Sequence, residues 1–247
     1  MSAKKASKVR MFGLALLVAA LAMPAGSAQF MGTNAAIYAP TVVAGVASLN
    51  WSGYALSTAP AYTSVHATWT VPAASCESGQ ASMSAFWVGL GGFSPTATGV
   101  EQIGTASNCD GKGEPSYFAW YELFPAPAQA VPVDVTPGDT VDASVTANGD
   151  GTYTLTLNSF STVQTGPAAD NTSAEWIAEA PATCTQKFTH CKPLPLTDFG
   201  GVHFGDMNAT PFAGPMFQIT MVTKSFAIKA APTPFDGSSF TVFRLHK

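Results

Sequence analysis

Charged residues are scarce in this chain of 247 residues, where Asp, Glu, Lys and Arg together make up 11%. Four of the eleven basic residues, Lys4, Lys5, Lys8 and Arg10, lie within the first ten positions. Without residues 1–28, seven basic residues remain against fifteen acidic ones, which gives a net charge of −8. Nucleic acids and anionic membranes bind basic surfaces, so we expect neither as a partner.

Long apolar segments are absent beyond the N-terminal end. Met11–Met23 is apolar but too short to span a bilayer comfortably, and Gly26–Ala28 supplies the small residues of a cleavage site. Together with the basic residues before them, they predict a secretory signal peptide over residues 1–28 and a secreted, extracellular protein. Residues 29–48 show no clear period, and we interpret them as a short pro-segment or an N-terminal arm. Residues 49–247 then form a single domain.

Motifs of metal and cofactor chemistry are also missing. The sequence contains no C-x-x-C, H-E-x-x-H, G-x-G-x-x-G or Walker spacing, so we expect no metal and no cofactor. It has no G-x-S-x-G nucleophile elbow either. A serine hydrolase remains an alternative, although no histidine lies in a setting that favours a catalytic triad. The four histidines are His66, His190, His203 and His246.

Cysteine is rare but even in number, with Cys76, Cys109, Cys184 and Cys191. In an exported chain this number predicts two disulfides. Three pairings are open. We favour Cys76–Cys109 together with Cys184–Cys191, because the second pair could close one local loop.

Helical periodicity is absent after the signal peptide, and strand patterns take its place. Apolar and polar residues alternate from Ser64 to Val71, which predicts a half-buried strand. Ser84–Leu90 is almost continuously apolar, as in a strand covered on both faces. Two alternating runs flank Asn148–Gly151, a turn sequence typical of a hairpin. Many short strands separated by turn signals predict an all-β sandwich or barrel.

Two carboxylates flank a tryptophan in the segment Ser173–Glu179, although charged residues are rare elsewhere. We hypothesise that Glu175 is a catalytic carboxylate and keep Glu179 as its reserve. The plainer interpretation is a strand in which two exposed glutamates lie beside the core residue Trp176.

The proposed partner of Glu175 is Gln102, in a short strand predicted at residues 99–105. Neighbouring side chains of a strand point to opposite faces, so only one of Glu101 and Gln102 can enter a given cleft. We expect Gln102 and Glu175 to face each other across a gap that admits one water molecule and a peptide carbonyl.

Paired carboxylates of a glycosidase provide the main alternative. Glu175 and Glu179 on one straight strand would lie about 13 Å apart at ~3.3 Å per residue, too far for either glycosidase geometry. Glu122 could supply a second acid from another strand. A carbohydrate-binding or glycoside-hydrolysing sandwich, with tryptophans stacked on sugar rings, therefore stays open, as does a non-catalytic adhesion module.

Five sequence blocks occur in an order that resembles the glutamic peptidase (eqolisin) family. The resemblance covers residues 49–206 and continues toward the C-terminus. One block alone would be weak evidence for the family, whereas five blocks in the same order are fairly specific evidence. The blocks are Asn50–Tyr54, Phe86–Leu90, Glu101–Gly104, Ala119–Glu122 and Ala174–Ile177.

The resemblance implies a sandwich of two antiparallel sheets, of the concanavalin-like jelly-roll type, that acts as an acid endopeptidase on polypeptides. It also implies that Gln102 and Glu175 are the catalytic pair. No cofactor is implied, and we expect a monomer. The substrate-binding residues implied by the resemblance are Trp51, Trp87, Trp120, Tyr121 and Glu122.

The chemistry of the pair suits peptide hydrolysis. A carboxylate such as Glu175, with an ordinary pKa near ~4.3, can take a proton from water and later give it to the leaving amine. The side-chain amide of Gln102 can donate to the oxyanion of the tetrahedral intermediate. The sequence departs from fungal members of the family at Phe118 and at Leu123–Phe124, which affects the expected subsite preference and leaves the pair in place.

Overall fold

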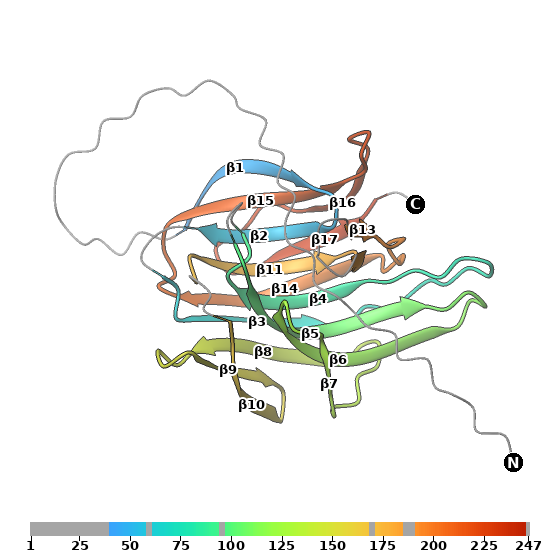
Figure 1. The fold of residues 1–247 in the computed structure, drawn as a ribbon. Coiled ribbons are helices and arrows are strands. Elements are labelled where there is room, and N and C mark those ends of the chain that lie inside the picture. Colours follow the sequence, from blue (N-terminus) through green and yellow to red (C-terminus); the bar gives the residue numbers. More distant parts are fainter. Residues whose placement is uncertain (1–39, 58–60, 94–96, 168–170, 185–190, 246–247) are drawn as a thin grey trace, which may run out of the picture.

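The computed structural model describes residues 40–57, 61–93, 97–167, 171–184 and 191–245. All regular elements in these ranges are strands (Figure 1). Among the described residues, no helix has both the length and the apolar character needed to cross a membrane. The predicted signal peptide, residues 29–39, His190 and His246 lie outside the described ranges.

The segments predicted as strands are strands, with ends that differ by a few residues, and further strands that the sequence did not indicate lie between them. The strand predicted at residues 99–105, for example, continues to Cys109 as β5. The strands are β1 (Thr41–Ser48), β2 (Trp51–Ser57), β3 (Ser64–Thr70), β4 (Ala85–Leu90), β5 (Val100–Cys109), β6 (Pro115–Phe124), β7 (Gln129–Val131), β8 (Thr140–Ala147), β9 (Thr152–Leu157), β10 (Phe160–Thr165), β11 (Ser173–Glu179), β12 (Ala182–Cys184), β13 (Cys191–Pro193), β14 (Gly201–Thr210), β15 (Pro215–Val222), β16 (Ile228–Pro232) and β17 (Phe240–Arg244).

Fifteen strands form one hydrogen-bonded sheet in the order β10-β9-β8-β3-β14-β17-β16-β15-β2-β11-β4-β5-β6-β7, with β1 paired to β15. This sheet bends into two layers, because β4 and β5 contact β8, and β11 contacts β3 and β14, without sharing ladders with them. We call the layer that contains β15, β2, β11, β4, β5 and β6 the front layer. The all-β sandwich is confirmed, with the difference that β16 and β17 join its two layers into one continuous sheet.

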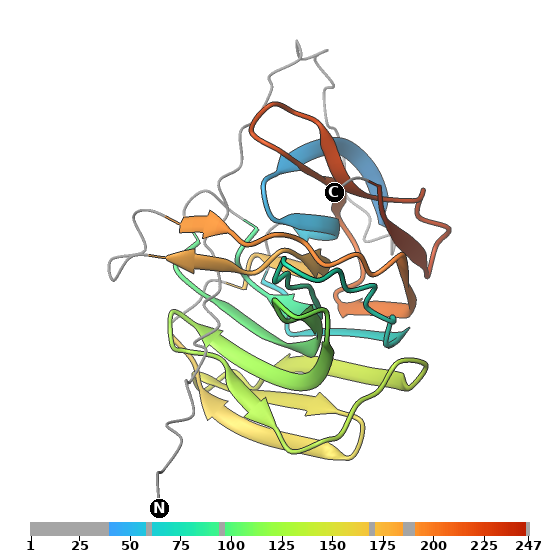
Figure 2. The ribbon, with the colours of Figure 1, turned by 90° about the vertical axis from the view of Figure 1, so that its right-hand side faces the viewer.

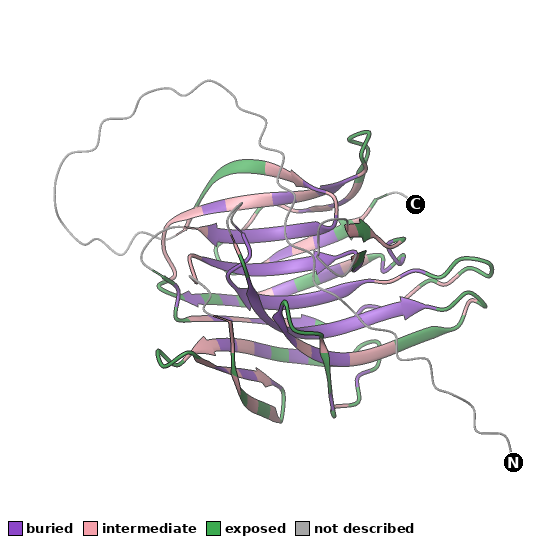
Figure 3. Ribbon diagram, in the orientation of Figure 1, coloured by how far each residue is buried: buried purple, intermediate pink, exposed green. Residues whose placement is uncertain are grey.

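Strand β2 and its neighbours at the centre of the front layer are buried along almost their whole length, whereas the edge strand β10 alternates (Figure 3). Side chains that point toward the second layer, such as Trp176, Ile103 and Phe86, pack with Trp69 and Phe204 from that layer. A second apolar cluster draws its members only from the front layer and from the residues that follow β4. We call the face that carries this second cluster the outer face.

The predicted hairpin is confirmed as β8 and β9, joined through Asn148–Gly151. Its alternation places Val141, Ala143 and Val145 in the core between the layers. Because one face of the hairpin is buried, its register follows directly from the sequence pattern.

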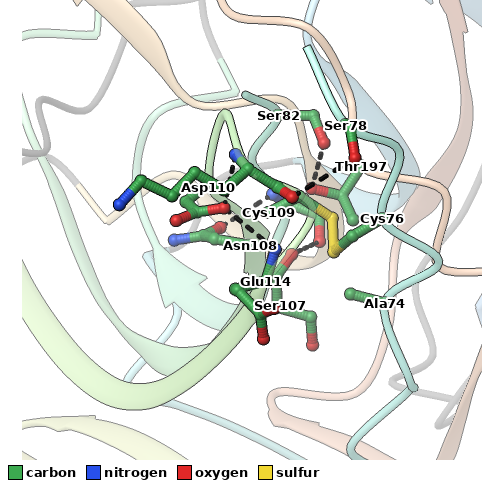
Figure 4. Close-up of a disulfide and its surroundings, with 12 residues drawn as sticks. Ala74, Cys76, Ser78, Ser82, Ser107, Asn108, Cys109, Asp110, Glu114 and Thr197 are labelled. Carbon is green, nitrogen blue, oxygen red and sulfur yellow. Dashed lines mark hydrogen bonds between the residues drawn. A yellow bond between two sulfur atoms is a disulfide. The ribbon is translucent and has the colours of Figure 1, made fainter. Parts of the chain in front are cut away.

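Both disulfides that we favoured are present, Cys76–Cys109 and Cys184–Cys191. The first ties the loop after β3 to the last residue of β5 (Figure 4). Near this bridge, the backbone N–H of Ser84 donates to Asn108 Oδ1 at 3.1 Å. The second disulfide closes the small hairpin of β12 and β13, which projects from the side of the sandwich in Figure 2.

Part of the predicted N-terminal arm lies in the sheet. Residues Thr41–Ser48 form β1, which pairs with β15 in parallel from Pro215 to Met221. The strand is mostly exposed, with Val42 and Val43 open to solvent. The ordered sheet therefore begins before Leu49.

Candidate active site

A row of directly paired residues crosses six neighbouring strands of the front layer. Residues opposite one another in a ladder project from the same face of a sheet, so the side chains of this row share the outer face. The row runs Phe217, Ala55, Glu175, Gly89, Gln102 and Glu122, on β15, β2, β11, β4, β5 and β6 respectively.

Gly89 separates Glu175 from Gln102 in this row. Neighbouring strands lie about 4.8 Å apart, so the two backbones are about 10 Å apart. A Cβ on Gly89 would lie 2.9 Å from the ring of Trp87 and 3.2 Å from Cβ of Gln102. Residue 89 therefore has no room for a side chain, and none stands between the two functional groups in the row.

Glu175 is held by the chain that follows β4. The backbone N–H of Phe93 donates to Glu175 Oε1 and to Ser173 Oγ, each at 3.2 Å. Burial, and then the neighbouring Glu175, raise the pKa of Tyr62 to about 12.

Gln102 is held by its cross-strand neighbour. Its Nε2 donates to Oε2 of Glu122 at 2.7 Å. Its Oε1 is buried and accepts no hydrogen bond from the described residues, and Nε1 of Trp120 is buried without a described acceptor as well. Buried polar atoms normally have partners, so these two atoms mark a place for water or for a ligand.

Glu179 lies on the same face as Glu175, at the far end of β11. Trp87 Nε1 donates to Glu179 Oε2 at 2.8 Å, and Asn50 Nδ2 donates to Oε1 at 3.2 Å. Burial raises the pKa of Glu179 to about 7, even though the hydrogen bonds from Trp87 and Asn50 lower it. The ring of Trp87 that donates to this carboxyl group meets that of Trp51 edge to face, with centroids 5.0 Å apart.

The structure brings together most of the predicted site residues. Trp51, Trp87 and Trp120 all belong to the cluster on the outer face, and Glu122 joins them through the row. Tyr121 does not, because it pairs with Ile103 and packs against the core between the layers. Its ring stacks on Phe160, and we leave Tyr121 out of the proposed site.

The expected opening between Glu175 and Gln102 is covered. Their exposed fractions are 0% and 1%. The ring of Phe93 lies 5.2 Å from that of Phe217, centroid to centroid. At Gly92 a Cβ would lie 3.3 Å from the ring of Trp51. Phe93, which follows β4, thus packs over the row at Phe217 and Glu175.

Three contributors to this site were missed in the sequence. They are Gly89, the backbone N–H of Phe93 and the hydroxyl of Ser173. A signal existed for the first, since a glycine inside a buried strand often marks the close approach of a ligand or another backbone. No pattern in the sequence indicates that the N–H of Phe93 meets both Ser173 and Glu175.

The two histidines within the described ranges, His66 and His203, give no support to a serine hydrolase. Both ring nitrogens of His66 are engaged, Nε2 with Asp142 at 3.2 Å and Nδ1 with the carbonyl oxygen of Asp206 at 3.0 Å. His203 Nδ1 contacts the hydroxyl of Thr241. Within the described ranges, no group of three His, Cys, Asp or Glu residues is arranged to hold a metal ion.

A cavity of about 190 Å³ lies away from the row and contains none of the predicted site residues. Its lining includes Glu77, Asp198, Lys229 and Arg244. Burial and the charge of Arg244 lower the pKa of Lys229 to about 8. Two basic and two acidic side chains balance there, and we assign this cavity no part in the chemistry of the row.

Comparison with known proteins is consistent with this arrangement. Residues 49–233 match the family described as the Peptidase A4 family. The chain is 30% identical over 172 residues to Scytalidopepsin B of Scytalidium lignicola, an alignment that covers 65% of this chain and 63% of that protein. It is 28% identical over 227 residues to Aspergillopepsin-2 of Aspergillus niger, covering 79% of this chain and 77% of the relative.

Solved structures show the same fold. Scytalido-glutamic peptidase with a transition state analog inhibitor matches with a TM-score of 0.66 at 23% identity, over 79% of this chain and 98% of that one. Aspergilloglutamic peptidase from Aspergillus niger matches with a TM-score of 0.53 at 21% identity, over 66% and 99% of the two chains.

Proposed function

The chain belongs to the peptidase A4 family, and from this we propose that it is an acid endopeptidase that cleaves polypeptides through Glu175 and Gln102. One observation carries the proposal. The two side chains share the outer face and flank Gly89, the one position between them without a side chain. The rest of the chain supplies the sheet that fixes this spacing.

In the proposed reaction, Glu175 acts on a water molecule held above Gly89. The carboxylate takes a proton from the water as its oxygen attacks the peptide carbonyl carbon, and the carbonyl electron pair moves onto oxygen. An N–H of Gln102 that is not bound to Glu122 donates to this oxyanion. The protonated Glu175 then gives its proton to the leaving nitrogen as the carbon–nitrogen bond breaks.

Burial of the pair fits this chemistry and also imposes a requirement. Hydrogen bonds aimed at developing charge are stronger where water is excluded. A peptide can reach the row only if the ring of Phe93 moves away from Phe217. We therefore include this displacement in substrate binding.

A digestion series tests the proposal. The mature protein is incubated with casein from strongly acid to neutral pH in the presence of pepstatin, and we expect cleavage in acid that pepstatin does not block. Glu175→Gln and Gln102→Ala should each abolish cleavage while the fold remains. The matched control is Glu179→Gln, the same change on the same strand and face. If Glu175→Gln keeps full turnover and Glu179→Gln loses casein cleavage, the catalytic carboxylate is Glu179 and the assignment to Glu175 is wrong.

The alternative function, a glycosidase that uses Glu122 and Glu175 as its two carboxylates, is less well supported. Glu122 and Glu175 lie in the same row, but Gly89 and Gln102 stand between them, and Glu122 is bonded to Gln102. Retention on a polysaccharide column without casein cleavage would favour this alternative.

We also propose that the protein is exported and acts as a monomer. The predicted signal peptide and the two disulfides support export. N-terminal sequencing of the exported protein should find a start at or after residue 29, and light scattering should give the mass of one chain.

A further inference from the structure

Glu122 and Gln102 form a buried pair that the reaction described above does not explain. They lie directly opposite each other on β6 and β5. Their exposed fractions are 2% and 1%, and Gln102 Nε2 donates to Glu122 Oε2 at 2.7 Å. A short hydrogen bond between two enclosed side chains fixes both of them.

The amide of Gln102 and the carboxyl group of Glu122 differ in the hydrogen bonds that they can make. An amide has one end that donates and one end that accepts, with nearly the same shape. Oε2 of Glu122 accepts the hydrogen bond from Gln102, and a carboxylate oxygen that carries no proton can only accept. Beside Glu122, the amide of Gln102 therefore has one favourable orientation, in which the NH₂ group faces the carboxylate. The atom left over is Oε1, which is buried without a described partner.

We propose that Glu122 is a positioning residue whose carboxylate holds the Gln102 amide in this single orientation. Oε1 then receives a hydrogen bond from the attacking water, and the second N–H of Nε2 remains for the oxyanion. The inference rests on the proposed roles of Gln102 and Glu175. It replaces the substrate contact that the family resemblance implies for Glu122, since Oε2 of this side chain is already engaged by Gln102.

A kinetic comparison tests the inference. The variant Glu122→Gln keeps the size of the side chain but can donate as well as accept, so both orientations of Gln102 become possible. We expect kcat on a fluorogenic peptide to fall about tenfold or more, with KM changed less than about twofold. An unchanged kcat, or a change confined to KM, would overturn the proposal.

A second readout does not depend on activity. The side-chain amide resonances of Gln102 are assigned by their loss in Gln102→Ala. In the wild type, one Nε2 proton should show the downfield shift of a strong hydrogen bond, and Glu122→Gln should remove this shift. An unchanged spectrum would overturn the proposal. If Gln102→Ala proved fully active, the proposed catalytic pair would fail, and the spectra would still decide whether Glu122 orients the amide.

Thr105→Val is the matched control for general weakening of β5. Trp69 Nε1 donates to Thr105 Oγ1 at 3.0 Å, a buried hydrogen bond on the same strand but on the opposite face. We expect Thr105→Val to lower the melting temperature and to keep kcat. If it lowers kcat as much as Glu122→Gln does, the loss in Glu122→Gln comes from the strand and the positioning role is refuted.

Discussion

Replacing Glu179 with glutamine should change how the stability of the fold depends on pH. The carboxyl group is buried on the outer face beneath Trp51 and Trp87. Burial raises its pKa from 4.5 to about 7, with hydrogen bonds from Trp87 and Asn50 opposing the rise. The folded protein therefore holds a proton at pH values where the unfolded chain has released it.

The sign and size of the effect follow from this difference. Between pH 4.5 and about 7 the folded state binds more protons than the unfolded state, so the free energy of unfolding falls as pH rises. At about 1.4 kcal/mol for each tenfold change in proton affinity, the total loss is roughly 3 kcal/mol. Glu179→Gln removes this titration. The variant also has a fixed cost of about 1–3 kcal/mol, because its NH₂ group meets N–H donors.

Urea unfolding at a series of pH values measures the difference. Both proteins carry Glu175→Gln, so that self-digestion does not interfere, and tryptophan fluorescence reports unfolding with the disulfides intact. The variant should be the less stable protein at pH 4, and its disadvantage should shrink by roughly 3 kcal/mol by pH 8. A stability difference that is the same at pH 4 and pH 8 would refute the reasoning.

Three further changes have defined outcomes. Gly89→Ala places a methyl group between Glu175 and Gln102, 2.9 Å from the ring of Trp87. We expect casein cleavage to fall by about 100-fold or more and the melting temperature to fall as well. A variant that stays active would contradict the proposed location of the water. Removing the Cys76–Cys109 disulfide, which spans 33 residues, should lower the free energy of unfolding in urea by about 4 kcal/mol. Removing the Cys184–Cys191 disulfide, which spans 7 residues, should lower it by about 2 kcal/mol. The reverse order would contradict the idea that each disulfide stabilises the fold by restricting the unfolded chain. Tyr121→Phe should keep kcat/KM within about twofold because Tyr121 lies on the opposite face, and a large loss would return it to the site.

Local patterns in the sequence predicted much of the fold. Alternation identified β3 and the β8–β9 hairpin because each buries one face only, which ties the period of two to the core. Alternation also placed Glu101 and Gln102 on opposite faces, as the pairing of β5 shows. The same argument separates Tyr121 from Glu122, so the position of Tyr121 was available from the sequence.

The site itself depends on strand order, which local patterns do not contain. Glu175 meets Gly89 because β11 inserts between β2 and β4, far from both in the chain. The residues after β4 close over the row through a backbone N–H, a group that every residue except proline carries. The sequence therefore predicted which residues form the site, but it did not predict that Phe93 packs over them.

The parallel strand β1 sets a boundary for shortened versions of this protein. A chain that starts at Leu49 would lose its pairing with Pro215–Met221 and leave unpaired N–H and C=O groups along β15. Such a bare edge recruits strands from other molecules. Expression designs, and any natural trimming that keeps the protein soluble, should therefore stop before Thr41.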